Sequence, residues 1–226
     1  MVCSCVLGAK ERFLCMDCSM DLPETLYWKR PYNPMADRFN AILERYRRDD
    51  EPMDYAFAAG YLFYHAENPY KAIPQALKYG GNVAAGRYFA ERFGRALAGE
   101  KHFADVDAVI PVPLHWWRKW RRGYNQAEVI AAALAKELGA KPFPRALVRG
   151  RRTRSQTTLS SSERLSNVEG AFRMKQLPSG TAPSHILLVD DTFTTGATLA
   201  ACYRAVRAAL GSGVRISVAT LAVVDN

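Results

Sequence analysis

The 226-residue sequence has no long hydrophobic segment and no recognisable targeting segment. Its apolar runs fall well short of the roughly 20 residues that a membrane-spanning helix requires. The first residues, Met1–Cys5, lack the basic and then apolar pattern of a secretory signal peptide. The chain also contains no internal repeats, which argues against solenoid and propeller architectures. We therefore expect a soluble cytoplasmic protein.

Acidic residues are too few to balance the basic ones. The chain has 31 lysines and arginines against 22 acids, a formal net charge of +9. This excess favours anionic partners such as nucleotides, pyrophosphate or nucleic acid, without choosing among them. Solvated surface charge is the alternative. With 49% hydrophobic and 23% charged residues the composition is globular, and the length allows one domain with a small appendage.

Cysteine is scarce except at the N-terminus, where four of the five cysteines form two close pairs. Cys3 and Cys5 are separated by one residue, and Cys15 and Cys18 by two. Two thiol pairs joined by a short loop indicate a four-thiolate structural zinc site, because a reducing cytoplasm disfavours disulfides. Free thiols or a degenerate site are the alternative, since the first pair is shorter than the favoured C-x-x-C spacing. Cys202 lies on the apolar face of an expected helix and is interpreted as a core residue.

The most informative segment is residues 186–198, which read ILLVDDTFTTGAT. Its four apolar residues predict a buried strand of a parallel sheet. Asp190 and Asp191 follow just past the strand's carboxyl end, where open α/β sheets bind ligands. Residues 194–198 then open a helix whose first N–H groups and threonine hydroxyls suit a phosphate. Because the two acids can accept hydrogen bonds from ribose hydroxyls, the pattern predicts a sugar-phosphate site. The alternative is a buried strand that ends by chance in two acids.

Strands alternate with helices over most of the chain, which predicts an α/β fold with a mostly parallel sheet. Strands are expected at 106–112, 146–148, 185–189 and 214–224, with a strand or hairpin at 168–174 and one or two strands, broken at Gly60, at 55–65. Helices are expected at 36–47, 69–79, 83–98, 125–138 and 196–210. Residues 21–23 and 29–34 indicate a linker. The chain thus divides into a Cys-rich zinc knuckle with its linker, residues 1–34, and a main domain, residues 35–226.

Two basic loops lie where they can complete the site. The first, residues 111–126, follows a strand and precedes a helix, so it shares the sheet edge of the two acids. Its cations and Gly123 can hold an anion such as pyrophosphate. The second, residues 149–159 with its continuation to Arg164, is long and polar, which is typical of a lid that closes over a charged ligand. A solvated basic loop is the alternative for each.

The segment 186–198 resembles the signature of the type I phosphoribosyltransferases, which bind phosphoribosyl pyrophosphate (PRPP) with Mg²⁺. A longer series of motifs runs along the chain: the N-terminal cysteines with Asp21–Pro23, Leu77–Gly80, Pro111–Leu114, Arg122–Gln126, Arg149, Thr153, Gln156, Arg164, Asn167–Val168 and Asp190–Thr198. In these motifs and their order the chain as a whole resembles the ComF family of phosphoribosyltransferase-like proteins linked to natural competence, with relatives in gluconate utilisation. One departure is the first cysteine pair, which the family usually spaces as C-x-x-C.

The resemblance implies a role for each motif. Residues 194–198 would cradle the 5′-phosphate, Asp190 and Asp191 the ribose hydroxyls, and loop 112–126 the pyrophosphate, with 149–165 as the flexible lid. Mg²⁺ would enter with the ligand and bridge pyrophosphate and ribose oxygens. Such sites displace pyrophosphate at C1 of the ribose by positioning and charge stabilisation, without a side-chain nucleophile. The expected ligand-binding residues are Asp190, Asp191, Thr192, Thr194, Thr195, Gly196, Ala197, Thr198, Arg121, Arg122, Gly123, Arg149, Arg152, Gln156 and Arg164.

Three functions fit this sequence. The first is a phosphoribosyltransferase acting on a nitrogenous acceptor that the sequence does not name. The second is a single-stranded-DNA-binding competence factor, in which Trp116, Trp117 and Trp120 stack bases among neighbouring cations; packing against a helix is the alternative for these rings. The third is a PRPP-binding scaffold without turnover. For the competence role the resemblance implies DNA uptake and natural transformation, with a helicase-like ATPase as a partner.

Overall fold

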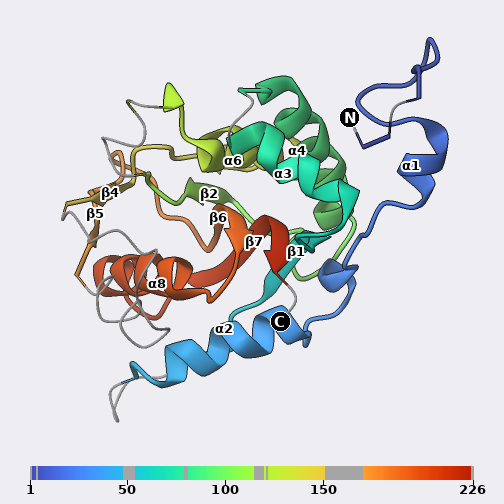
Figure 1. Ribbon diagram of the computed structural model, residues 1–226. Helices are drawn as coiled ribbons and strands as arrows, with labels where there is room; N and C mark the ends of the chain where they lie inside the picture. The colour runs from blue at the N-terminus through green and yellow to red at the C-terminus, as the bar shows by residue number, and fades with distance from the viewer. Residues whose placement is uncertain are drawn as a thin grey trace.

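A five-stranded parallel sheet forms the centre of the protein (Figure 1). The computed structural model describes residues 2–3, 5–47, 54–78, 81–114, 120, 122–150 and 170–224. The strand order is β1-β7-β6-β2-β3, and every neighbouring pair is parallel. The strands are β1 Ala58–Tyr64, β2 Ala108–Pro111, β3 Lys141–Pro142, β6 His185–Phe193 and β7 Arg215–Val224. The expected α/β fold with a mostly parallel sheet is therefore confirmed.

Helices cover both faces of this sheet. Those on one face are α2 Pro34–Glu44 and α8 Ala197–Leu210, and those on the other are α3 Ala72–Lys78, α4 Val83–Ala98 and α6 Gln126–Leu138. Successive residues of a strand point to opposite faces. In β6, Leu188 therefore packs in the core of α2 and α8, while Leu187 and Val189 pack in the core of α4 and α6. Burial on both faces explains the unbroken apolar run of β6.

Smaller elements flank this three-layer core. β4 Leu147–Arg149 and β5 Phe172–Met174 form a separate antiparallel pair, and β5 lies beside α8. The short helix α1 Met16–Met20 and a 3-10 turn at Tyr27–Lys29 precede α2. A second 3-10 turn, Pro69–Lys71, leads into α3. None of the helices in the described residues combines the length and hydropathy needed to span a bilayer.

The strongly periodic segments fold as expected. α4 spans the predicted residues 83–98, and Phe89, Phe93 and Leu97 along its inner face are fully buried. α6 begins after Asn125, whose Oδ1 accepts a hydrogen bond from the Ala127 N–H and so caps the helix. Cys202 is buried in the core, as predicted. The loop expected over 150–165 lies, apart from its first residue, outside the described residues.

Two expectations about strands are wrong. β1 runs unbroken through Gly60. β6 continues through both acids and ends at Phe193, because its pairing with β7 extends to the partners Phe193 and Val223. Asp190 and Asp191 are therefore held in the last part of a strand rather than in the turn that follows it. This placement fixes their backbone more firmly than a loop would.

The expected linker before residue 35 is packed against the sheet. The Phe63 N–H donates to Pro23 O and the Thr25 N–H donates to Tyr61 O, each over 2.9 Å, so this stretch borders β1. Trp28 is 3% exposed and packs in the same core as α4. Its indole supplies hydrophobic burial that a loose linker would lack.

Gly60 lies inside a strand because its neighbours leave no room for a side chain. An ideal Cβ at position 60 would lie 1.9 Å from Val223 Cγ2 and 3.3 Å from Met35 Sδ. Met35 belongs to α2 and Val223 to β7. The glycine thus permits a close approach of α2 and β7 to β1, which is a common use of glycine in strands.

Replacement of Gly60 by alanine should therefore destabilise the fold. The new methyl group must displace Val223 Cγ2, and such overpacking costs about 1–3 kcal/mol of unfolding free energy. Gly213→Ala is the matched control, because a Cβ there meets no atom within 4 Å. Urea denaturation measures both variants. Equal unfolding free energies for the two proteins would contradict the packing explanation.

Candidate functional site

The two acids of β6 meet a lysine at the carboxyl edge of the sheet. The Asp191 N–H donates to Asp190 Oδ1 over 2.8 Å. Lys78, the last residue of α3, places its Nζ 3.4 Å from Asp191 Oδ1 and donates to Thr192 Oγ1 over 2.9 Å. The side chains of Lys78 and Asp191 are 26% and 18% exposed, so water screens this ion pair only in part. Two carboxylates, a hydroxyl and an ammonium thus converge at one point.

Burial makes the first of these acids hard to ionise. Desolvation, and then the charge of Asp191, raise the pKa of Asp190 to about 7. Lys78 and Arg149 act in the opposite direction. Arg149 belongs to β4, so the β4–β5 pair contributes a cation to the same region. A partly buried acid with a strongly raised pKa beside specific charge partners is typical of a functional site.

A hollow of about 60 Å³ opens beside Asp190. The turn from Thr192 to Leu199, which leads into α8, forms its wall. α8 begins at Ala197, whose N–H donates to Thr195 Oγ1 over 3.5 Å, while the N-cap residue Gly196 has no side chain to cap the N–H groups that follow. Free N–H groups at a helix start attract anions. The hollow is far smaller than the roughly 300–1,000 Å³ of a drug-sized pocket, and its size and donors suit a single group such as a phosphate.

The shape of this turn is fixed from two sides. Gly196 has a φ of 77°, and a Cβ there would lie 2.8 Å from the Phe193 ring and 3.0 Å from Ile42 Cδ1. Any other residue would be both strained and crowded at this position. Arg38 of α2 donates to Thr194 O over 3.0 Å, and its guanidinium lies 5.0 Å from the centroid of the Phe193 ring. The phosphate-sized hollow is therefore preformed.

The loop before α6 is tied to the same sheet edge. The Tyr124 hydroxyl donates to the carbonyl of Leu77, next to the lysine of the acid cluster. Asn125 Nδ2 donates to Val112 O over 3.0 Å, just past the end of β2. Gly123 has a φ of 81°, which lets the chain turn sharply into the helix. The first turn of α6 thus lies at the carboxyl end of β2, a strand that is paired with β6.

Gln126 carries an unused donor at this helix start. Its side chain is buried, with the residue 2% exposed, and its Oε1 accepts a hydrogen bond from Arg122 Nη1 over 3.2 Å. Its Nε2 has no hydrogen-bond partner among the residues that the structure describes. Because buried amide donors are nearly always paired, this group indicates a position where an acceptor of a bound ligand would fit.

The structure gathers some predicted site residues and leaves others undescribed. Asp190 to Thr198 lie together, with Arg149 close enough to influence Asp190. Arg122 and Gly123 lie at the start of α6. The remaining predicted ligand residues, Arg121, Arg152, Gln156 and Arg164, lie outside the described residues, as do Trp116 and Trp117.

Two residues of the site were missing from the prediction. Lys78 contacts the acids directly, and Arg38 fixes the turn into α8. Lys78 lies within the family motif Leu77–Gly80, which the sequence matches without indicating a role for the lysine in the site. No sequence pattern singles out Arg38, because its role depends on how α2 packs across the sheet.

The N-terminal cysteines form a separate cluster. The Sγ atoms of Cys3, Cys5 and Cys15 lie within 4.8 Å of one another, and the Cys18 N–H donates to Cys15 Sγ over 3.5 Å. The backbone N–H of Cys5 and the neighbouring thiols lower the pKa of the Cys3 thiol to about 7, which favours the thiolate form that binds metals. These thiols could hold a metal such as zinc, which takes sulfur ligands in tetrahedral sites.

Known proteins similar to this chain are competence and DNA utilization proteins. Over 93 residues it is 38% identical to "Competence protein F" of Haemophilus influenzae, a match that covers 41% of each chain. Over 94 residues it is 37% identical to "DNA utilization protein YhgH" of Escherichia coli K12, covering 42% of this chain and 40% of that one. Over 127 residues it is 32% identical to "Competence protein ComFC" of Bacillus subtilis, covering 56% and 46% respectively.

These matches confirm the family resemblance that the motifs predicted. They span 40–46% of the lengths of the relatives. No family model matches the chain.

Metal analysis tests the cysteine cluster. We expect about one zinc per chain in protein purified without chelators, if four thiolates coordinate one ion. Cys15→Ala should lose the metal, because Cys15 contacts both pairs of thiols. Cys202→Ala, in the core of the main domain, is the control and should keep it. A folded, zinc-free wild-type protein, or zinc retained by Cys15→Ala, would rule out this site.

The raised pKa of Asp190 predicts a pH-dependent stability. Its folded pKa of about 7 lies above the ordinary pKa of 3.8, so the folded state binds a proton that the unfolded state releases between these values. Its contribution to the unfolding free energy therefore falls as pH rises from about 4 to 7. Asp190→Asn removes this penalty and should stabilise the ligand-free protein by about 1–2 kcal/mol more at pH 8 than at pH 5. The exposed Asp54→Asn is the control; the same gain at both pH values would contradict the prediction.

Proposed function

We propose that the chain belongs to the ComF family, which the matched relatives support, and that it is a phosphoribosyltransferase-like protein that binds PRPP or another ribose phosphate with Mg²⁺. The observation that carries this proposal is the pair of acids on β6 beside a preformed, phosphate-sized hollow. Acids that accept hydrogen bonds and a helix start that donates them match the two ends of a ribose 5-phosphate.

Each part of the ligand has a partner of complementary chemistry. The 5′-phosphate accepts hydrogen bonds from the N–H groups at the start of α8 and from the hydroxyls of Thr194, Thr195 and Thr198. The ribose hydroxyls donate to Asp190 and Asp191. The pyrophosphate binds at the start of α6, where Arg122 and Gln126 Nε2 can donate hydrogen bonds to it. In this proposal residues 149–165 form a lid that covers the bound ligand.

The acid pair also fits the Mg²⁺ that accompanies such ligands. Mg²⁺ prefers oxygen ligands and is commonly held by one or two carboxylates together with substrate phosphates. The carboxyl of Asp190 is held near its neutral form by burial and by Asp191, so a nearby cation would favour its charged form. When bound, the ion would neutralise charge on the pyrophosphate. Lys78 supplies a second, permanent positive charge at the acids.

The reaction that this site would support is substitution at C1 of the ribose. A nitrogen of the acceptor forms the new C1–N bond while the C1–O bond to pyrophosphate breaks, and the leaving pyrophosphate carries the electron pair. The chain's own contribution is to position both groups and stabilise the developing charge. A scaffold that binds PRPP without turnover needs the same contacts, so the acceptor reaction must be assayed separately.

The cellular role that we propose follows the relatives' names. The matched relatives are named as competence and DNA utilization proteins, and we propose DNA uptake as the process in which this chain acts, alongside a helicase-like ATPase. In this proposal residues 1–34 form a zinc knuckle that packs on the main domain, and residues 35–226 carry the ligand site.

Calorimetric titration with PRPP tests the ligand. Wild-type protein should bind PRPP only with Mg²⁺ present, and Asp190→Asn combined with Asp191→Asn should weaken binding at least tenfold, because hydrogen bonds to charged groups contribute about 1.5–3 kcal/mol each. Asp54→Asn should bind normally. Unchanged affinity of the double variant would refute the ribose contact. With binding established, pyrophosphate release in the presence of a panel of bases separates a transferase from a scaffold.

Binding of single-stranded DNA is a second candidate, favoured by the 80% exposure of Trp120. A tryptophan left in water beside a basic stretch offers a stacking platform for bases. The same titration with a short oligonucleotide includes Trp120→Ala, which should weaken binding by about 1–3 kcal/mol if one base stacks there. An unchanged affinity would remove Trp120 from any DNA site.

A further inference from the structure

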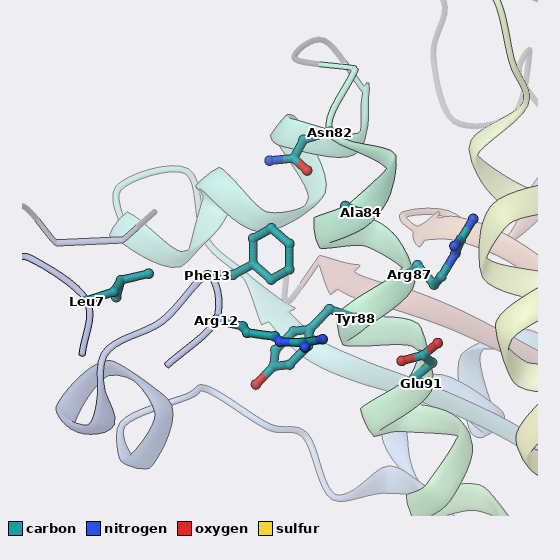
Figure 2. A pocket seen from close by; sticks show the side chains of 8 residues that line it. All are labelled: Leu7, Arg12, Phe13, Asn82, Ala84, Arg87, Tyr88 and Glu91. Atoms are coloured by element: carbon teal, nitrogen blue, oxygen red, sulfur yellow. The ribbon is translucent and has the colours of Figure 1, made fainter. Parts of the chain in front are cut away.

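A cavity of about 870 Å³ lies between the N-terminal cysteine segment and α4 (Figure 2). Its lining includes Leu7, Arg12 and Phe13 from the N-terminal segment and Arg87, Tyr88 and Glu91 from α4. None of these residues belongs to the sheet-edge site described above. The volume falls within the roughly 300–1,000 Å³ typical of small-molecule sites, and it is far larger than the hollow beside Asp190.

Helical spacing builds one wall of this cavity. Ala84, Arg87, Tyr88 and Glu91 follow at intervals of three, one and three residues, which places them on one face of α4. The opposite face of the helix is buried in the core, with Phe89 and Phe93 fully inaccessible. The cavity wall is therefore rigid, because the core fixes the helix behind it.

The other wall contains a strained aromatic residue. Phe13 has a φ of 62°, a left-handed conformation that is uncommon for a bulky residue. Leu14 and Cys15, which follow it, are buried and hold the chain in place. The Phe13 ring packs on Tyr88, with centroids 5.4 Å apart and planes inclined by 50°. Such strain at a cavity wall is common at sites that clamp ligands, and here it presents an aromatic ring to the cavity.

Two arginines line the cavity. Arg12 directly precedes Phe13, whereas Arg87 extends from α4 away from Phe13 and Tyr88 (Figure 2). Both are exposed, and within the described part of the chain neither guanidinium has a hydrogen-bond or ion-pair partner. Glu91 is the one acid among the lining residues. The cavity thus combines an aromatic pair, two available cations and a single carboxylate acceptor.

We propose that this cavity binds a nucleotide unit, with its base against Phe13 and Tyr88 and its phosphate at Arg12. Aromatic rings stack on bases of any sequence, and arginines neutralise phosphates. The carboxylate of Glu91 is suited to accept a hydrogen bond from an N–H group of the base. The unit is either a free mononucleotide or one residue of a single strand, since both present the same chemistry. The site is independent of ribose-phosphate binding at the sheet edge and goes beyond the proposed function.

The first test compares charge variants with a matched control. Fluorescence anisotropy of a labelled thymidine oligonucleotide, with the full chain purified without chelators, measures affinity against salt. Arg12→Gln should weaken binding and reduce the slope of log K against log salt by about 0.7, because one phosphate neutralised on a single strand contributes about 0.7 to the slope. Arg145→Gln removes one exposed charge outside the cavity and should leave both unchanged. An unaltered salt slope in Arg12→Gln would overturn the proposal.

The second test probes stacking. Tyr88→Leu keeps an apolar side chain on α4 but removes the ring, and it should weaken oligonucleotide binding about fivefold or more, as expected for one stacked base. Cross-linking with an oligonucleotide that contains 5-iodouracil should label peptides with Phe13 or Tyr88. Labelling confined to other peptides would place the base elsewhere and contradict the proposal, even if a variant fails to fold.

Two further arms separate this site from the others. Arg12→Gln should still bind PRPP, and Asp190→Asn with Asp191→Asn should still bind the oligonucleotide. Loss of PRPP binding alone would therefore refute the sheet-edge proposal and leave this one intact. Titration with thymidine monophosphate distinguishes a free nucleotide from one residue of a strand. Binding of the monophosphate that Arg12→Gln weakens assigns a free nucleotide, whereas oligonucleotide binding alone assigns a strand.

Discussion

The partial burial of two adjacent carboxylates at the end of a central strand is the constraint around which the site is arranged. β6 has neighbours on both sides and helices over both faces, so Asp190 is only partly exposed to water, and its pKa is raised to about 7. A carboxylate that is withdrawn from water needs positive charge nearby. Lys78 at the end of α3 and Arg149 in β4 supply this positive charge. The positions of α3 and of the β4–β5 pair are therefore part of the electrostatics of the acids as well as of the core.

The other end of β6 carries a buried polar residue with a structural role. His185 is fully buried, with Nδ1 2.8 Å from Asp105 Oδ1 and Nε2 2.8 Å from Ser217 Oγ. Burial lowers its pKa to about 4, so the ring is neutral at physiological pH, with one nitrogen donating and the other accepting. Both nitrogens are satisfied within the protein. By contrast, Asp190 retains charge repulsion from Asp191 and borders an open hollow. This difference favours a structural role for His185 and a ligand-binding role for Asp190.

Periodicity and local chemistry account for the parts of the molecule that sequence predicted well. α4 shows its apolar face in the sequence, α6 carries a capping Asn125, and the run Ile186–Val189 is apolar because both of its faces are covered. The parts that were missed depend on distant partners. β6 extends to Phe193 because β7 is long enough to pair with it, and Lys141–Pro142 form a strand only because β2 lies alongside. The acids and the threonine turn were identifiable as a motif, whereas Arg38 and the N-terminal cavity arise from packing between segments far apart in sequence.

The sheet-edge site and the N-terminal cavity are joined by one rigid unit. α3 ends at Lys78, which contacts the acids, and α4 carries Tyr88 into the cavity. The two helices approach so closely that a Cβ on Gly86 would lie 2.4 Å from Leu77 Cδ1. Tyr124 binds the carbonyl of Leu77 and ties the start of α6 to the same unit. A close-packed contact of this kind transmits displacement because it has no free volume to absorb it. The cysteine segment forms the other wall of the cavity, so the arrangement of the thiol cluster and the shape of the cavity depend on each other.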